Sequence, residues 1–173
     1  MKMKLAEVYF QIINEILDFD KIGSYDYKWS NNNIATFNTS DGLDIEIRFD
    51  DATSELSDFE FLPFLQGKVQ SLTNISFTVK GEHTKAADLN LKAYLPIMLT
   101  VRNTIEDWMK TNDPECVSII SVGRENEFMT DSSKSKVYEM MVTKYPIAGY
   151  IKSKIVWKPT NMEGFCLYNS SLK

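Results

Sequence analysis

The sequence predicts an α+β fold, a single domain over residues 1–173 in which a mixed, mostly antiparallel sheet is flanked by helices. Segments with apolar residues three and four positions apart, typical of helices, occur between segments in which apolar and polar residues alternate, typical of strands. A chain of 173 residues with 43% hydrophobic residues is long enough for one buried core and short for two. No repeat, linker or low-complexity segment divides it.

The N-terminal segment predicts a helix and then a short strand. Apolar residues recur with helical spacing over residues 5–17, and Gly23 follows as a break. Residues 25–29, Tyr-Asp-Tyr-Lys-Trp, alternate as a strand with its aromatic rings on one face. Residues 30–33, Ser-Asn-Asn-Asn, are a turn cluster.

The clearest element is a hairpin of strands 34–37 and 43–49 around Ser40-Asp41-Gly42. Asp-Gly favours a type I′ turn, which needs positive φ angles. The second strand alternates, so we expect one buried face and one solvated face. Its inward residues are Leu43, Ile45, Ile47 and Phe49, and its outward residues are Asp44, Glu46 and Arg48.

The middle of the chain predicts a strand, a long helix and a second strand. Residues 50–68 are acidic and irregular, and form either a covering loop or a short helix. A strand over 74–79 precedes a helix that ends at Asp113-Pro114, and Pro96 is expected in its first turn. The inward stripe of this helix is Tyr94, Met98, Val101, Ile105 and Trp108. The nearly continuous apolar run 116–122 predicts a central strand covered on both faces.

The C-terminal segment predicts a second helix and a strand pair. Ser132 or Ser133 caps a helix that runs to Tyr145, with Val137, Met140 and Met141 inward. Strands over 150–157 and 165–168 follow. The predicted order is α-β-β-β-β-α-β-α-β-β.

Composition excludes several classes of protein. No apolar stretch approaches the length of a membrane span, and polar residues interrupt the N-terminal segment, so we expect a non-secreted protein without membrane association. Cys116 and Cys166 are expected to be buried, reduced thiols, and with His83 as the one histidine there is no metal-site pattern. A net charge of −5 disfavours nucleic-acid binding, which would depend on a lysine-rich stretch interleaved with Tyr145, Tyr150 and Trp157.

Charge is divided along the chain. Residues 41–60 carry eight acids against Arg48, and residues 134–158 carry six lysines against Glu139. These segments are either solvated faces or a partner surface, including one on which the chain associates with itself.

Other candidate sites have little support from spacing. His83, beside Glu82, could act as a general base or be an ordinary loop histidine. Asp50, Asp51 and Glu55 could hold a hard cation, but they lack the spacing of a calcium loop. The 123–131 loop, with Arg124, Glu125 and Glu127, follows the central strand where α/β folds bind ligands.

The order strand, long helix, central strand, helix and strand pair resembles the second half of the N-acetyltransferase (GNAT) superfamily. The run 133–141, Ser-Lys-Ser-Lys-Val-Tyr-Glu-Met-Met, followed by Gly149-Tyr150, is similar to a motif of that family. The resemblance implies that Tyr138 protonates the departing thiolate of coenzyme A. It also implies that acetyl-CoA lies near Thr84, Lys85, Ala86 and Ala87.

The phosphate-binding loop of that family has no counterpart here. Its glycines let backbone N–H groups approach a pyrophosphate at the start of the long helix. Residues 80–91 contain no paired glycines and place Glu82 and Asp88 where anions would bind. We therefore expect no cofactor, with acetyl-CoA as the alternative.

The strand Ile75-Ser76-Phe77-Thr78 followed by Lys136-Val137-Tyr138-Glu139 also resembles small proteins of tailed bacteriophages. That resemblance implies a location in the cytoplasm of an infected host cell or in a virion. The resulting expectation is a non-catalytic accessory or virion protein that acts through a protein partner or self-association, with an N-acetyltransferase as the alternative.

Overall fold

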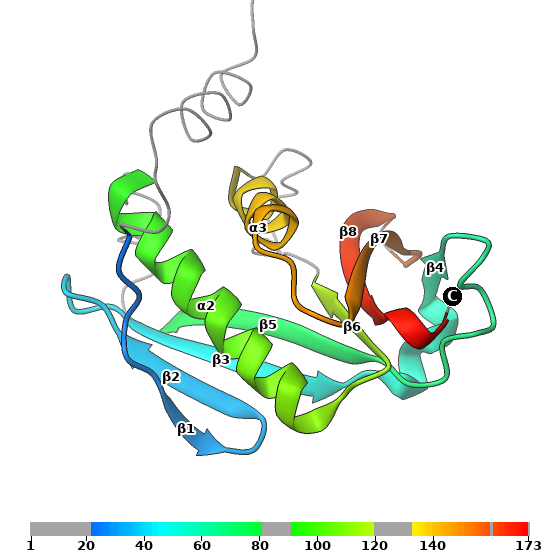
Figure 1. The fold of residues 1–173 in the computed structure, drawn as a ribbon, viewed down its shortest axis with the longest axis horizontal. Coiled ribbons are helices and arrows are strands. Elements are labelled where there is room, and N and C mark those ends of the chain that lie inside the picture. Colours follow the sequence, from blue (N-terminus) through cyan, green and yellow to red (C-terminus); the bar gives the residue numbers. More distant parts are fainter. Residues whose placement is uncertain (1–21, 81–90, 120–132, 160, 173) are drawn as a thin grey trace, which may run out of the picture.

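The computed structural model describes residues 22–80, 91–119, 133–159 and 161–172 (Figure 1). These residues form one mixed sheet of eight strands with helices packed against it, so the predicted α+β class is confirmed. The predicted helix over residues 5–17 lies outside the described residues.

The helices of this part of the chain are α2 (Leu91–Asn112) and α3 (Ser133–Lys144), with short 3₁₀ turns η2 (Thr53–Asp58) and η3 (Ser170–Leu172). The strands are β1 (Lys28–Asn31), β2 (Ile34–Asn38), β3 (Asp44–Asp51), β4 (Phe59–Phe61), β5 (Thr73–Lys80), β6 (Cys116–Ile119), β7 (Tyr150–Trp157) and β8 (Met162–Asn169). None of the helices in the described ranges has the length and hydropathy of a membrane span.

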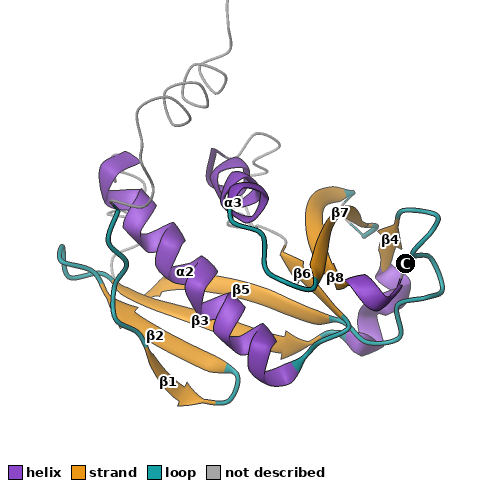
Figure 2. Cartoon of the chain, in the orientation of Figure 1, coloured by secondary structure: helices purple, strands orange, loops and turns teal. Residues whose placement is uncertain are grey.

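The strand order across the sheet is β1-β2-β3-β5-β6-β8-β7-β4. All neighbouring pairs are antiparallel except β5 and β6, which are parallel and paired from Thr73↔Val117 to Ile75↔Ile119. A parallel pair needs a crossover, and the chain passes through α2 between these two strands. Figure 2 shows α2 and α3 on the same side of the sheet.

The predicted hairpin is present as β2 and β3, but its turn is not type I′. A type I′ turn requires positive φ at both central residues, whereas only Gly42 in this loop has a positive φ, of 80°. The amide of Gly42 donates to Thr39 O at 3.0 Å, and the amide of Thr39 donates to Leu43 O at 2.9 Å. This is the three-residue loop in which a turn is followed by a residue of positive φ.

The two edge strands differ most from the prediction. The strand expected at 25–29 is shifted: β1 begins at Lys28 and extends through Asn31, so only Asn32 and Asn33 form the turn. The acidic stretch, expected as a covering loop or a short helix, contains the short 3₁₀ helix η2 and then the unpredicted strand β4, which pairs with β7. Periodicity could not reveal β4, because three residues are too few to distinguish an alternating pattern from chance.

The helix α2 was predicted correctly apart from its start. Pro96 lies inside the helix and not in its first turn. The hydroxyl of Thr100 donates to Pro96 O at 2.7 Å and accepts the amide of Tyr25 at 2.8 Å, so this turn also anchors the chain before β1. The helix ends at Asn112, and Asp113 has a positive φ of 43° before Pro114.

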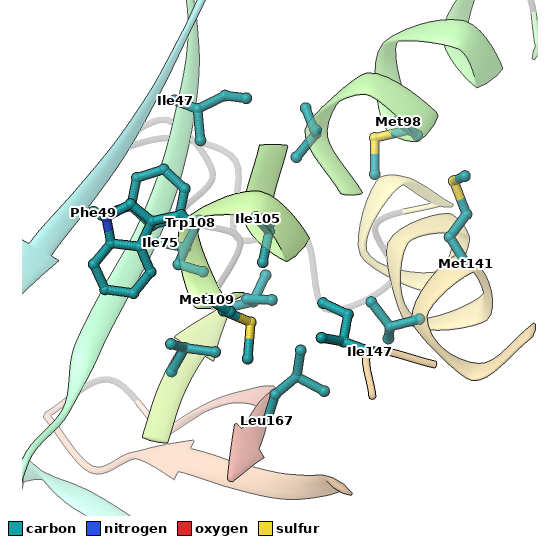
Figure 3. Packing of buried hydrophobic residues seen from close by; sticks show 14 of the residues in the cluster. Ile47, Phe49, Ile75, Met98, Ile105, Trp108, Met109, Met141, Ile147 and Leu167 are labelled. Atoms are coloured by element: carbon teal, nitrogen blue, oxygen red, sulfur yellow. The ribbon is translucent and has the colours of Figure 1, made fainter. Parts of the chain in front are cut away.

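Hydrophobic residues fill the space on both faces of the sheet. One cluster lies beneath α2 and α3 and includes Phe49, Ile105 and Met141 (Figure 3). A second cluster forms where the chain from η2 to β5 packs on β7 and β8, and it includes Phe59 and Leu65. The strand β6 supplies both clusters by alternation, which confirms the predicted central strand over its described residues.

The alternation predicted that the outer face of β3 is solvated, and the structure shows that only part of it is. Asp44 and Arg48 are exposed, but Glu46 is only 5% exposed and forms an ion pair with Arg48 at 2.5 Å. A carboxylate withdrawn from water needs such a partner, so this part of the polar face is organised around charge pairing.

Candidate functional site

Most residues implied by the acetyltransferase resemblance are not among those the structure describes. Tyr138 lies in α3, the second helix after β5, but its side chain is outside the described part. Thr84, Lys85, Ala86 and Ala87 are outside it as well. So are His83 with Glu82, and the 123–131 loop with Arg124, Glu125 and Glu127.

The acids considered as cation ligands lie at the end of β3 and in η2. Asp50, Asp51 and Glu55 are exposed, and no group of three metal-ligating side chains occurs among the described residues. The carboxylate of Asp51 instead accepts the amide of Thr53 at 2.9 Å, which lowers the pKa of Asp51 through hydrogen bonds to Thr53. The side chain of Asp51 thus closes the turn that leads into η2.

The two cysteines are buried and free, as predicted. They lie on the adjacent strands β6 and β8. Cys166 is the register partner of Ser118, and Cys116, two residues before Ser118, is on the same face of the sheet. A hydrogen bond with Cys166 and burial raise the pKa of the Cys116 thiol. A thiol of raised pKa inside a core is a poor nucleophile, so this pair belongs to the packing.

The acidic and basic segments meet in space. The strand β4, from the acidic segment, pairs with β7, from the basic segment, and the amide of Lys158 donates to Asp58 O at 2.8 Å. Lys152 pairs with Glu139 of α3 at 2.8 Å. The two segments are therefore neighbours through backbone pairing, whereas this ion pair joins two residues of the basic segment itself.

The aromatic residues of the basic segment take part in packing. Tyr145 and Tyr150 pack against the cluster beneath α2 and α3, and Trp157 packs against the cluster on the other face. The hydroxyl of Tyr150 also donates to Pro114 O at 2.8 Å. These contacts leave the rings half-buried rather than displayed for stacking on bases.

An aromatic series leads from the core to the surface at β1. Phe49 stacks on Trp108 of α2 with ring centroids 4.6 Å apart, and Trp29 lies 5.7 Å from Phe49. Tyr27 meets Trp29 edge to face, at 6.2 Å and 85°. Because Trp29 is still 40% exposed, the series ends in an accessible indole at the edge of the sheet.

The carboxylate of Asp107 lies beside the aromatic rings at β1. The hydroxyl of Tyr27 donates to Asp107 of α2. Burial, this hydrogen bond and the charges of Asp107 and Glu106 raise the pKa of Tyr27 well above its ordinary value. Tyr27, Trp29 and Asp107, which we call the β1 corner, thus combine two rings with a negative charge.

The turn after β1 is held against α2. The indole Nε1–H of Trp108 donates to Asn32 O at 3.0 Å, and the amide of Phe49 donates to Asn33 O at 2.9 Å. An open hollow of about 500 Å³ lies beside this turn. It is lined by Asn31, Asn32, Asn33, Ile34, Phe49, Asp50 and Asp51.

The sequence contained part of the signal for this site. The alternation of Tyr25, Tyr27 and Trp29 indicated aromatic rings on one face, and the asparagines after them indicated a turn. Asp107 could not be found in this way, because its contact with Tyr27 joins residues 80 positions apart. Comparison with protein-family models, with curated proteins and with solved structures gave no significant match.

Proposed function

We propose that this chain is a non-catalytic accessory or virion protein of a tailed bacteriophage that acts through protein–protein contacts. It binds either a protein partner or a second copy of itself, in the infected cell or in the virion. The scaffold is a degenerate relative of the N-acetyltransferases in which the phosphate-binding loop has been lost. The observation that carries the proposal is the exposed β1 edge with Trp29.

Several properties of β1 support a contact surface. Among the described strands it pairs with β2 alone, and all four of its residues are exposed. An edge strand presents unpaired backbone groups that another chain can extend. Tryptophan is enriched among the residues that dominate binding energy at protein interfaces.

The opposite edge of the sheet carries a second exposed apolar pair. Leu62 and Phe64, in the loop after β4, are 40% and 45% exposed. Phe64 contacts Tyr168 at 5.9 Å and so has a defined position. This pair offers a matched control for Trp29, because it is equally exposed and lies at the far end of the strand order.

The test compares the full wild-type chain with Trp29→Ala and Phe64→Ala. Light scattering after size exclusion reports self-association, and tagged capture during infection reports a partner. We expect a complex that Trp29→Ala loses and Phe64→Ala retains. A strict monomer that captures no partner in any form would contradict the proposal.

An acetyltransferase is the alternative, and one observation favours it. The order β5, α2, β6, α3, β7 and β8 is the order on which the resemblance depends. In that case Tyr138 would be the acid and residues 84–87 would lie near the cofactor. Calorimetry with millimolar acetyl-CoA decides: the proposed function predicts no binding, and saturable binding reduced by a Tyr138 variant would favour the enzyme.

A further inference from the structure

The outer side of β1 is a place where an extended peptide can add to the sheet. The strand pairs with β2 through Lys28↔Thr36 and Trp29↔Ala35, and no described strand lies on its other side. A register shift between Trp29 and Asn31 marks a bulge. Bulges occur where a sheet redirects a side chain or ends its pairing, often beside functional sites.

The side chain of Trp29 projects toward α2 and away from that of Lys28. Its register partner, Ala35, is fully buried on the helix-covered face, whereas Thr36, the partner of Lys28, is on the opposite face. Successive side chains of a strand alternate between faces. The one cation of β1 is thereby separated from the β1 corner.

The β1 corner has the chemistry to bind a cation. Its two rings meet edge to face at 85°, and Trp29 keeps 40% of its surface exposed beside this contact. Aromatic faces attract ammonium and guanidinium groups, and tryptophan does so most strongly. A cationic side chain against the exposed part of Trp29 would gain this attraction, which an aliphatic side chain would not.

The carboxylate of the corner lacks a cationic partner in the described part of the chain. Its neighbour Glu106 is paired with Arg102 and Lys110. Asp107 has no such ion pair there, and its recorded partner is the neutral hydroxyl of Tyr27. The corner therefore keeps a net negative charge that a bound cation would neutralise.

We propose that the β1 corner binds an arginine or lysine side chain of an extended peptide segment that pairs with the outer edge of β1. This inference rests on the proposed function and specifies the chemistry of the partner at that surface. Backbone pairing supplies affinity in such complexes, and the side-chain site supplies selectivity. The acids Asp50 and Asp51, exposed beyond the turn that ends β1, add to the attraction for a basic segment.

The test uses short blocked peptides in which a central residue is flanked by threonine and valine. The central residue is arginine, lysine or citrulline, which is neutral and has nearly the shape of arginine. Amide and indole shifts of the labelled full chain report the binding site, and the Trp29 indole is assigned from its loss in Trp29→Phe. We expect the cationic peptides to shift β1 and the Trp29 indole, and citrulline to bind about tenfold more weakly.

Protein variants separate the parts of the site. Trp29→Ala is expected to weaken binding of the arginine peptide about tenfold, and Trp29→Phe less. Asp107→Asn is expected to weaken it about threefold by removing the charge. Phe64→Ala, the control, leaves binding unchanged. An arginine peptide N-methylated on alternate residues should lose binding, because it cannot donate to the edge.

The outcomes distinguish this inference from the proposed function. Equal affinity for arginine and citrulline peptides would overturn the cation site while leaving a contact surface at β1. No shift at β1 with any peptide would overturn the inference as a whole. In that case the proposed function is still judged separately, by whether Trp29→Ala loses the captured partner.

Discussion

Tyr150 links the end of α2 to β7, and its hydroxyl donates to Pro114 O at 2.8 Å and to Asp113 at 3.3 Å. Burial, followed by the charge of Asp113, raises the pKa of Tyr150 to about 12. The folded state therefore holds a proton that the unfolded state releases near pH 10. Its contribution to stability is complete below about pH 10 and is lost as the pH rises through about 12.

Replacing Asp113 by Asn should lower the pKa of Tyr150 in the folded state. The stability contributed by the protonated hydroxyl should then be lost at a lower pH than in the wild-type chain. The measurement is a pH titration of ring-labelled tyrosine by NMR, with the signal assigned from Tyr150→Phe. Asp58→Asn is the control, because Asp58 lies in η2, beside the end of β7 opposite to Tyr150. A Tyr150 that titrates at its ordinary value in the wild-type chain would contradict the described contacts.

Trp108 joins α2 to the β1–β2 turn through a stack on Phe49 and a hydrogen bond to Asn32 O at 3.0 Å. Trp108→Phe keeps an aromatic ring but removes the donor. We expect it to lower the free energy of unfolding by about 1 kcal/mol beyond the change in packing. Denaturant unfolding measures this, and a value unchanged from wild type would show that the bond contributes nothing.

The loop between β4 and β5 is held by one carboxylate. Glu115, the residue before β6, accepts the amides of Gln70 and Ser71 at 2.9 and 2.7 Å and the hydroxyl of Ser71 at 3.0 Å. Glu115→Ala leaves these amides without a partner, which should cost about 1–3 kcal/mol of stability. In Glu115→Ala, hydrogen exchange at the amides of residues 70 and 71 should accelerate. Glu163→Ala, in β8, is the control and should leave this exchange unchanged.

Elements with a long, regular pattern could be predicted from the sequence, and the edges of the sheet could not. Alternation over 43–49 and helical spacing over α2 gave the right element types, because burial of one face determines both patterns. The strand β4 is defined by its pairing with β7, nearly a hundred residues away, which leaves no local pattern. Pro96 was misplaced because tertiary packing of α2 outweighs the preference of proline for a first turn.

The candidate site was less predictable than the fold. The aromatic alternation before the turn was visible, but the exposure of Trp29 follows from β1 being the last strand of the sheet. Strand order depends on long-range pairing, as does the contact between Tyr27 and Asp107. The residues expected for acetyl transfer, Tyr138 and Thr84 to Ala87, stay predictions from the resemblance.

At the scale of the whole molecule, the described fold separates its packed clusters from the proposed contact surface. Two clusters on opposite faces of one sheet bury most of the large apolar side chains that the structure describes. The exposed large apolar side chains of the described ranges are Trp29 at one end of the strand order and Leu62 and Phe64 near the other. The proposed contact surface lies at the first of these edges, at β1.

Site-specific photo-cross-linking tests that claim most directly. A photoreactive residue replaces Ser30 of β1 in the full chain, and the same residue replaces Ser54 of η2 as an exposed control. Under native conditions we predict a discrete cross-linked product from position 30, either to a second copy or to one partner, that disappears with Trp29→Ala. No product at position 30, or equal products at both positions, would contradict a contact surface at the β1 edge.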